Sequence, residues 1–211
     1  MFFMGLLEAG QPGAFQTAFY LSQRSPRALV EGISASLVDA EQARTRGDGA
    51  AIIAALRGVA RGFTDGGDHA SATIFSSRAL AAARSTGDAA AEVLLLLDVL
   101  SSEEGRGNRA SAVSLAEAAV AAADIAGDAA SGAISRAAVM RLRTADADAA
   151  EAAGDAAASL RYHIMVLATA SATGDKKAEA KARYNSGRSS VLAGDAQQGI
   201  THLTEFVRCQ A

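Results

Sequence analysis

The side chains that could perform acid–base, metal or nucleophilic chemistry are few in this sequence and lie far apart. The histidines are His69, His163 and His202. None of them has a second histidine or a carboxylate at a metal-ligand spacing that stands out. The acidic pairs Glu103-Glu104 and Asp146/Asp148 are more typical of solvated helix ends than of paired catalytic carboxylates. Because no grouping of Ser, His and Asp stands out either, we expect neither a metal site nor enzyme activity.

Two further motifs that could carry chemistry also favour a structural interpretation. Gly66-Gly67-Asp68 is not preceded by a strand or followed by Gly-Lys-Ser/Thr, as a phosphate-binding loop would be. Cys209 is the only cysteine, which excludes an internal disulfide and a cysteine-based zinc site and fits a reducing compartment. We therefore predict no cofactor and no small-molecule substrate.

The composition favours helix and argues against nucleic acid as a partner. Half of the 211 residues are apolar, mostly alanine, and proline occurs only at Pro12 and Pro26. Alanine loses no side-chain entropy in a helix, so most of the chain is expected to be helical. The net charge of −3 leaves no basic excess to neutralise a phosphate backbone.

The apolar stretches are too short to suggest a membrane protein. The start of the chain, Met1 to Leu7, lacks a positively charged region, and the acidic Glu8 follows it directly. We therefore predict a packing segment rather than a signal peptide. The longest other apolar run, Val93 to Leu97, is far below the roughly 20 residues needed to cross a bilayer. We expect a soluble protein of the cytoplasm or cytoskeleton with no membrane partner.

These scattered side chains are set on a regular framework, because Gly-Asp or Gly-Asn recurs at a step of 20 residues. About one such pair would be expected by chance, so the series predicts a structural repeat. The pairs are Gly47-Asp48, Gly67-Asp68, Gly87-Asp88, Gly107-Asn108, Gly127-Asp128, Gly154-Asp155, Gly174-Asp175 and Gly194-Asp195.

Each pair joins the end of one helix to the start of the next. Glycine suits the left-handed residue after a helix, and Asp or Asn suits the N-cap, where its side chain accepts a backbone N–H. Such short connections make neighbouring helices antiparallel. The helices alternate in character, so the predicted unit is a hairpin of about 40 residues. The four hairpins pair helices 49–64 with 68–85, 88–104 with 108–125, 128–152 with 155–172, and 175–192 with 195–209.

The step from Gly127 to Gly154 is longer than the others by seven residues. Seven residues turn a helix by about 700°, only about 20° short of two full turns, so the buried face is kept. We predict one long helix whose acidic end, Thr144 to Glu151, projects beyond the stack. A short loop around Asp146 to Asp148 is the alternative.

Before the repeats, two further helices are predicted. One covers Ala14 to Ser22, and the other starts at Pro26, with Ser25 as N-cap, and runs to about Arg46. We expect residues 1–48 to cap the first face of the solenoid formed by residues 49–211, with repeats at about 49–86, 87–126, 127–173 and 174–211.

This pattern resembles the tetratricopeptide repeat (TPR) in its longer form. Residues Ala182 to Gly187, followed by Gly194-Asp195, are similar to the first helix and turn of such a repeat. The resemblance implies an all-α protein, a right-handed α-solenoid of antiparallel helix hairpins with about four repeats plus N-terminal helices. It also implies a non-enzymatic protein that binds other proteins.

In TPR folds the first helices line a concave groove that takes a peptide or a helix. Counting back from each turn places basic groups at the two ends of this groove, with leucines between them. The predicted groove residues are Arg57, Arg61, Leu94, Leu97, Arg141, Lys181, Tyr184 and Arg188. They could hold an extended acidic and apolar segment, the alternative being a solvated groove with scattered charges. Asn185 and Arg188 resemble the Asn and basic residues of repeats that clamp a C-terminal carboxylate. Such a clamp needs matching residues on a neighbouring first helix, where Asp98 and Ala145 stand here.

Several stretches are similar, in the same order, to the tetratricopeptide repeat protein 29 family of motile cilia and sperm flagella. They are Leu6 to Gly10 with Phe15 and Phe19, Ala40 to Ala43 with Gly47, and Leu100 to Gly105. This resemblance implies a scaffold of the axoneme associated with dynein arms, with axonemal dynein or doublet-microtubule proteins as partners. That family is longer, so we expect a truncated relative or part of a longer product. The alternative function is a soluble peptide-binding regulator, such as the sensor repeats of a bacterial transcription factor.

Overall fold

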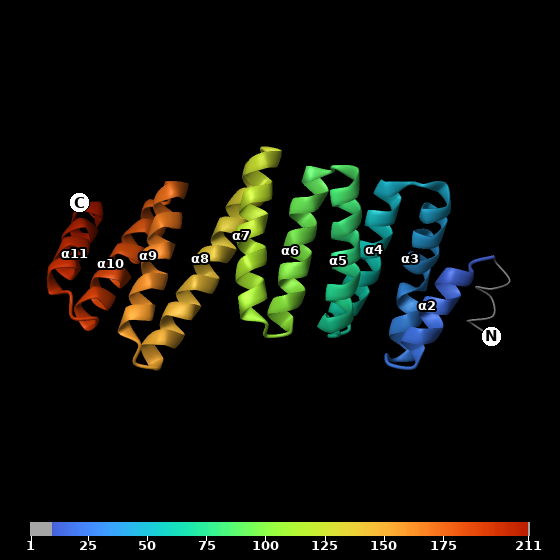
Figure 1. The fold of residues 1–211 in the computed structure, drawn as a ribbon, viewed down its shortest axis with the longest axis horizontal. Coiled ribbons are helices and arrows are strands. Elements are labelled where there is room, and N and C mark those ends of the chain that lie inside the picture. The colour runs from blue at the N-terminus through green and yellow to red at the C-terminus, as the bar shows by residue number, and fades with distance from the viewer. Residues whose placement is uncertain (1–9, 211) are drawn as a thin grey trace. The chain divides into compact units, whose positions relative to one another are not determined.

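The computed structural model describes residues 10–210, all of which lie in helices or the short turns between them. The segment Met1 to Leu7 lies outside the described residues. The helices, shown in Figure 1, are α2 (Pro12–Ser22), α3 (Arg27–Arg46), α4 (Gly49–Asp65), α5 (His69–Thr86), α6 (Ala89–Gly105), α7 (Arg109–Ala126), α8 (Ala129–Ala152), α9 (Ala156–Thr173), α10 (Lys176–Leu192) and α11 (Ala196–Gln210). No strand occurs between residues 10 and 210, and the predicted all-α solenoid class is confirmed.

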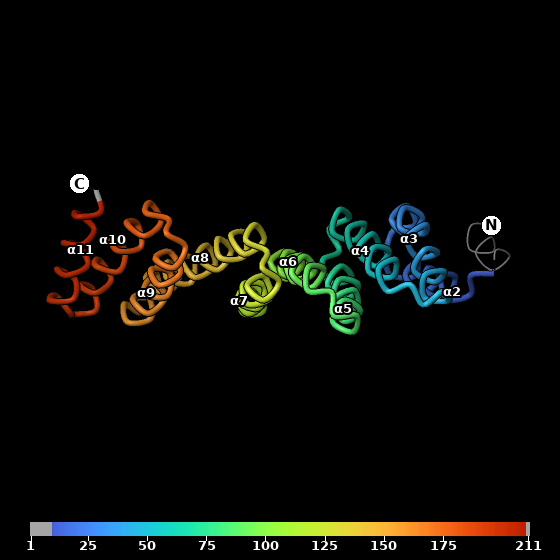
Figure 2. Tube along the Cα trace, turned by 90° about the horizontal axis from the view of Figure 1, so that it is seen from above, coloured from blue at the N-terminus to red at the C-terminus, as the bar shows by residue number. Residues whose placement is uncertain are grey.

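The chain divides into two compact units between Asp128 and Ala129. The first unit contains α2 to α7 and the second contains α8 to α11. Within each unit every helix packs against the next one along the chain. In the first unit, α4 and α6 lie on one side and α5 and α7 on the other (Figure 2), which is the two-layer arrangement of stacked hairpins. The sequence does not mark this division, because Gly127-Asp128 has the same form as the other turns.

The turns are built as the Gly-Asp repeat predicts. All eight glycines of the series have a positive φ, between 67° and 89°, where a side chain would be strained. The following Asp or Asn caps the next helix. Asp88, for example, accepts a hydrogen bond from the Ala91 N–H at 2.9 Å. The same cap is formed by Asp48, Asp68, Asn108, Asp155, Asp175 and Asp195.

Two types of turn alternate along the chain. After α3, α5, α7 and α9 the left-handed glycine follows the helix directly. After α4, α6 and α10 one right-handed residue comes first, namely Gly66, Arg106 or Ala193. The alternation confirms that the structural unit is a pair of helices rather than a single one.

The first unit is held together by aromatic and leucine side chains that pack against small residues. Phe63 of α4 stacks on Phe75 of α5 with ring centroids 5.6 Å apart. Further along, Leu95 and Leu96 of α6 are fully buried. Small residues of α5 and α7 lie inside, which allows close helix packing. They include Ala72, Ser76, Ala79, Ala112, Ala116 and Ala119.

The second unit confirms the single long helix but contradicts its projecting acidic end. α8 runs unbroken through residues 145–151, so the alternative loop is wrong. Ala147 is fully buried, and Glu151 forms an ion pair with Arg188 of α10. Ala147 comes five residues after Leu142, so the buried side of α8 turns to another face of the helix at its end, and the acidic end packs within the unit.

Two details near the start of the chain differ from the prediction. α2 begins at Pro12 rather than Ala14, because proline needs no hydrogen-bond acceptor in the first helical turn. Pro26 is the N-cap of α3 rather than its first residue, and no side chain caps that helix. At the start of α2, the backbone N–H groups of Gly13 and Ala14 donate hydrogen bonds to Glu41 of α3.

Candidate partner-binding site

A pocket in the second unit brings together two of the predicted groove residues. It has a volume of about 330 Å³ and lies between α8, α9 and α10. Arg141 and Lys181, which are 40 positions apart in the sequence, both line it. The other lining residues are Met140, Thr144, Val166, Ala178, Ala182 and Asn185. We call this the α8–α10 pocket.

The helical repeat explains why these side chains meet. On α10 the lining residues Ala178, Lys181, Ala182 and Asn185 recur at steps of three and four, which places them on one face of the helix. The antiparallel hairpins set this face opposite a lining stretch of α8 that begins at Met140. The small alanines leave the hollow open, because they do not fill the space between the helices.

The α8–α10 pocket combines an apolar lining with cationic and amide groups. Lys181 is exposed, and no carboxylate in the described part of the chain forms an ion pair with it. Its ammonium group is therefore available to a carboxylate from outside. Asn185, one turn further along, can donate or accept a hydrogen bond. Arg141 also lines the pocket and is held by contacts within the chain.

The other two predicted residues of α10 do not line this pocket. The Tyr184 ring packs against Phe206 of α11, with centroids 5.5 Å apart. Arg188 binds Glu151 of α8, and this hydrogen bond raises the pKa of the arginine. The pair of Asn185 and Arg188 that resembles a carboxylate clamp is thus divided, since Arg188 already holds a carboxylate of its own chain.

The predicted groove residues of the first unit lie along α4 and α6. Arg57 forms a two-point ion pair with Asp98, with Nε and Oδ2 2.6 Å apart, so its charge is balanced within the fold. Arg61 is exposed, and Leu94 is 42% exposed. Leu97 is half-buried against the core. Partner binding by these residues stays a prediction.

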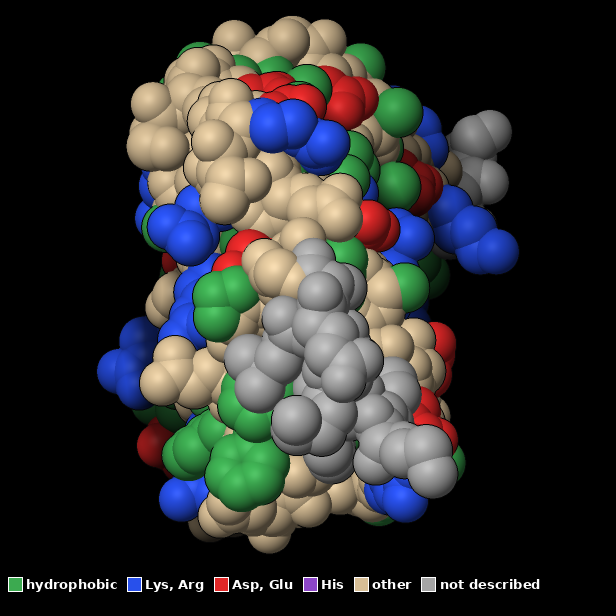
Figure 3. Space-filling model, turned by 90° about the vertical axis from the view of Figure 1, so that its right-hand side faces the viewer, with side chains coloured by type: hydrophobic (Ala, Val, Ile, Leu, Met, Phe, Trp, Pro, Cys, Tyr) green, Lys and Arg blue, Asp and Glu red, His purple; other side chains and the backbone are tan. Residues whose placement is uncertain are grey.

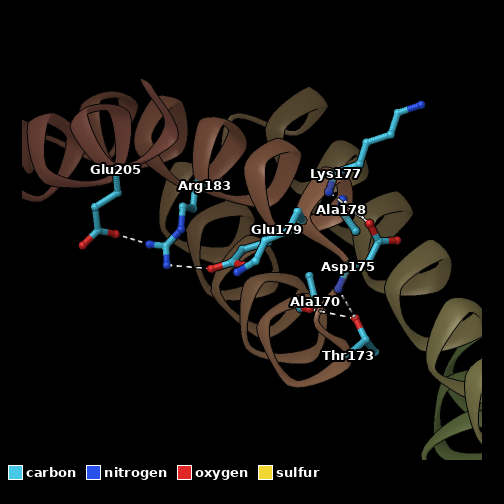
Figure 4. A network of polar contacts seen from close by, with 9 residues as sticks. Ala170, Thr173, Asp175, Lys177, Ala178, Glu179, Arg183 and Glu205 are labelled. Atoms are coloured by element: carbon cyan, nitrogen blue, oxygen red, sulfur yellow. Dashed lines mark hydrogen bonds and ion pairs between the residues drawn. The ribbon is translucent and has the colours of Figure 1, made fainter. Parts of the chain in front are cut away.

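A polar network that the sequence reasoning missed anchors α10 and α11 (Figure 4). Arg183 donates hydrogen bonds to Glu179 of its own helix and to Glu205 of α11. The hydrogen bond from Arg183, together with one from Lys176, lowers the pKa of Glu179. Asp175 caps the start of the same helix through Ala178. The spacing of Glu179 and Arg183, four residues apart, is the sequence signal that could have indicated the ion pair.

Among residues 10–210 no group of three His, Cys, Asp or Glu side chains lies close enough together to hold a metal ion. His163 of α9 is buried, and this burial lowers its pKa. In the same range, no helix has both the length and the apolar character needed to span a bilayer.

No family model and no curated protein sequence matches this chain. Several solved structures do match it. A putative kinesin light chain of Podosopora anserina, described as having nearly identical TPR-like repeats, matches with 18% sequence identity and a TM-score of 0.51. The match covers 95% of this chain and 96% of that one, and a variant of the same protein with a single substitution matches equally well. The chain has the TPR-like repeat fold. BtubC (BKLC) of P. vanneervenii matches with 16% sequence identity and a TM-score of 0.45. That match covers 87% of this chain and 91% of the other.

Proposed function

We propose that this TPR-like protein is a non-enzymatic protein–protein interaction scaffold and that the α8–α10 pocket is a binding site for a partner segment. The observation that carries the proposal is the lining of this pocket, where an unpaired Lys181 and the amide of Asn185 stand beside an apolar surface. Repeat solenoids present such surfaces on rigid helices, which suits recognition of other proteins.

The dimensions of the pocket define the kind of segment that fits. A volume of about 330 Å³ accepts one or two side chains rather than a whole helix. An apolar side chain would pack against Met140, Val166 and Ala182, and a neighbouring carboxylate would bind the Lys181 ammonium group. The site therefore suits an extended segment with an acidic residue next to an apolar one.

Quantitative affinity purification from an extract of the native host tests this function. The comparison uses the wild-type chain, the variant Lys181→Glu/Asn185→Ala and the control Lys177→Glu, which reverses an exposed charge on the same helix outside the pocket. We expect a set of proteins that the wild type and the control recover equally and the pocket variant loses by at least tenfold. Equal recovery by all three would contradict the proposed site.

At a finer level we propose that the scaffold is a component of motile cilia or flagella, with axonemal dynein or doublet-microtubule proteins as partners. This proposal is supported by the sequence resemblance to the tetratricopeptide repeat protein 29 family. Proteomics of purified axonemes tests it, and presence only in a cytosolic or bacterial fraction would contradict it. A DNA-binding domain encoded in or beside the same gene would instead favour the peptide-binding regulator.

A further inference from the structure

A second hollow surface lies in the first unit, between α2 and α5. It consists of two adjoining depressions, of about 560 Å³ and 250 Å³, which share Thr17, Phe75 and Arg78. The larger lies between α2 and α5, and the smaller reaches α3 and α4. The lining includes Tyr20, Arg24, Glu41, Arg44, Ile74 and Arg78. We call this surface the α2–α5 groove.

Apolar side chains are left uncovered along the α2–α5 groove. Tyr20 of α2 is 55% exposed and Ile74 of α5 is 53% exposed. Below them Phe75 and Leu37 belong to the buried core of the unit. Figure 3 views this end of the first unit and shows apolar side chains beside basic ones on its surface. The groove can therefore remove an apolar side chain of a partner from water.

Two arginines of the α2–α5 groove stack on aromatic rings. The Arg24 guanidinium lies 4.7 Å from the centroid of the Tyr20 ring. The Arg78 guanidinium lies 5.5 Å from the centroid of the Phe75 ring. A cation–π contact holds each guanidinium group near its ring and leaves N–H groups to donate, which favours two-point binding of a carboxylate.

The charges that line the groove are unbalanced. The cations are Arg24, Arg44 and Arg78, and Glu41 is the only carboxylate in the lining. Both oxygens of Glu41 already accept hydrogen bonds from the backbone of α2. Within residues 10–210 no carboxylate forms an ion pair with any of the three arginines. This excess of positive charge occurs in a chain that has more acidic than basic residues overall.

We propose that the α2–α5 groove binds an acidic segment of another protein, with at least two carboxylates on either side of an apolar side chain. The carboxylates bind Arg24 and Arg78, and the apolar side chain packs between Tyr20 and Ile74. The charge complementarity selects this partner, because an apolar segment without carboxylates would leave the guanidinium groups unmatched. The groove lies on other helices than the α8–α10 pocket, so this inference goes beyond the proposed function.

Selection from a displayed library of random twelve-residue peptides against the full chain tests the proposal. The selected peptides are then synthesised with a fluorescent label, and their affinities are measured by fluorescence anisotropy. The test variant is Arg24→Glu/Arg78→Glu. The control is Arg161→Glu/Lys177→Glu, which changes the net charge equally at exposed positions of α9 and α10. Circular dichroism confirms that both variants keep their helix content.

We expect enriched peptides that contain Asp or Glu beside an apolar residue. They should bind the groove variant at least tenfold more weakly than the wild type or the control, and replacement of their acids by amides should weaken binding similarly. Failure to enrich acidic peptides would overturn the proposal, as would equal binding to the groove variant. Peptides that lose affinity with Lys181→Glu instead bind the α8–α10 pocket, which would also overturn it while supporting the proposed function.

Two further measurements would recognise other occupants of the groove. A wild-type dimer in light scattering that dissociates on Arg24→Glu/Arg78→Glu would assign the groove to a second copy of the chain. Peptide binding that appears only after deletion of residues 1–9 would assign it to the start of the chain. Either result would overturn the proposal of an external acidic segment.

Discussion

At the scale of single residues, carboxylates stabilise this fold by accepting hydrogen bonds at defined places. Glu103, near the end of α6, is 3% exposed and accepts hydrogen bonds from Arg106, Thr73 and Asn108. The same Asn108 caps α7, although its contact to the Ser111 N–H is long, at 3.5 Å. The sequence suggested that Glu103-Glu104 was a solvated helix end, whereas Glu103 ties three segments of the first unit together. Its partner Thr73, 30 positions away, could not be inferred from spacing alone.

Loss of an N-cap is expected to destabilise the first unit by a predictable amount. Replacement Asp88→Ala removes the acceptor of the Ala91 N–H and should cost about 1 kcal/mol of unfolding free energy. Urea denaturation measures this against the control Asp39→Ala, at an exposed position within α3. A cost equal to that of the control would show that the cap contributes nothing.

The hydrogen bonds to Glu103 should make stability depend on pH in the acid range. Burial alone would raise the pKa of Glu103, but the hydrogen bonds from Arg106, Thr73 and Asn108 together lower it. Because the folded pKa lies below the unfolded one, the carboxylate stabilises the fold above the ordinary glutamate pKa of about 4.3. This contribution is lost as the pH falls through the lower folded pKa.

The variant Glu103→Gln measures this contribution. At pH 7 we expect it to cost about 1 to 3 kcal/mol, because charged hydrogen bonds to a buried group are lost. The difference from the wild type should shrink as the pH falls below about 4. A difference that does not change with pH would mean that the carboxylate charge is not involved. Denaturant unfolding between pH 3 and 7 provides the measurement.

At the scale of helices, the sequence predicts boundaries and phase well because both are local properties. The Gly-Asp pairs place the ends of α4 to α11 within one residue, since C-caps and N-caps depend on a few neighbouring atoms. The position of an ion pair depends instead on which helices are neighbours. Arg57 was therefore predicted as a groove cation, although Asp98 of the next first helix balances its charge. The burial of Ala147 at the end of α8 also depends on neighbouring helices, so the acidic residues around it did not indicate it.

The buried side of the α8 end makes two neighbouring alanines respond differently to the same change. Ala147 is fully buried and Ala149 is exposed. The replacement Ala147→Glu would place a charge in the core of the second unit and should cost more than about 2 kcal/mol of stability. Ala149→Glu should change stability by less than about 0.5 kcal/mol. Thermal or urea denaturation distinguishes them, and equal tolerance would instead support a projecting helix end.

The attachment of α11 depends on specific contacts as well as on apolar burial. α11 packs on α10 at Gly187, where an added Cβ would lie 2.8 Å from Leu203. Glu205 adds an ion pair to Arg183. We expect Glu205→Gln to accelerate amide hydrogen exchange in residues 196–210 and to leave α8 unchanged. The control Arg208→Gln alters an exposed charge on the same helix, and an equal effect of both changes would exclude a specific role for the ion pair.

At the scale of the whole molecule, each compact unit presents a hollow surface that combines cations with apolar side chains. The repeat pattern, together with the resemblance to TPR folds, predicted Arg141 and Lys181 as groove residues, because the first helices of successive hairpins face the same way. It did not predict the α2–α5 groove, whose cations are Arg24 in the turn after α2, Arg44 of α3 and Arg78 of α5. A chain with two such surfaces can hold two partner segments, which is the activity expected of a scaffold.

Photo-crosslinking from Met140 tests the central claim, partner binding at the α8–α10 pocket, most directly. The chain contains four methionines, of which Met140 lines the pocket and Met165 is exposed on α9. The protein is produced with a diazirine analogue of methionine, irradiated in a native extract and analysed by mass spectrometry. We predict discrete protein adducts that disappear with Met140→Leu or Lys181→Glu and persist with Met165→Leu. Adducts at residue 140 that survive Lys181→Glu, or the absence of any adduct at residue 140, would contradict the account.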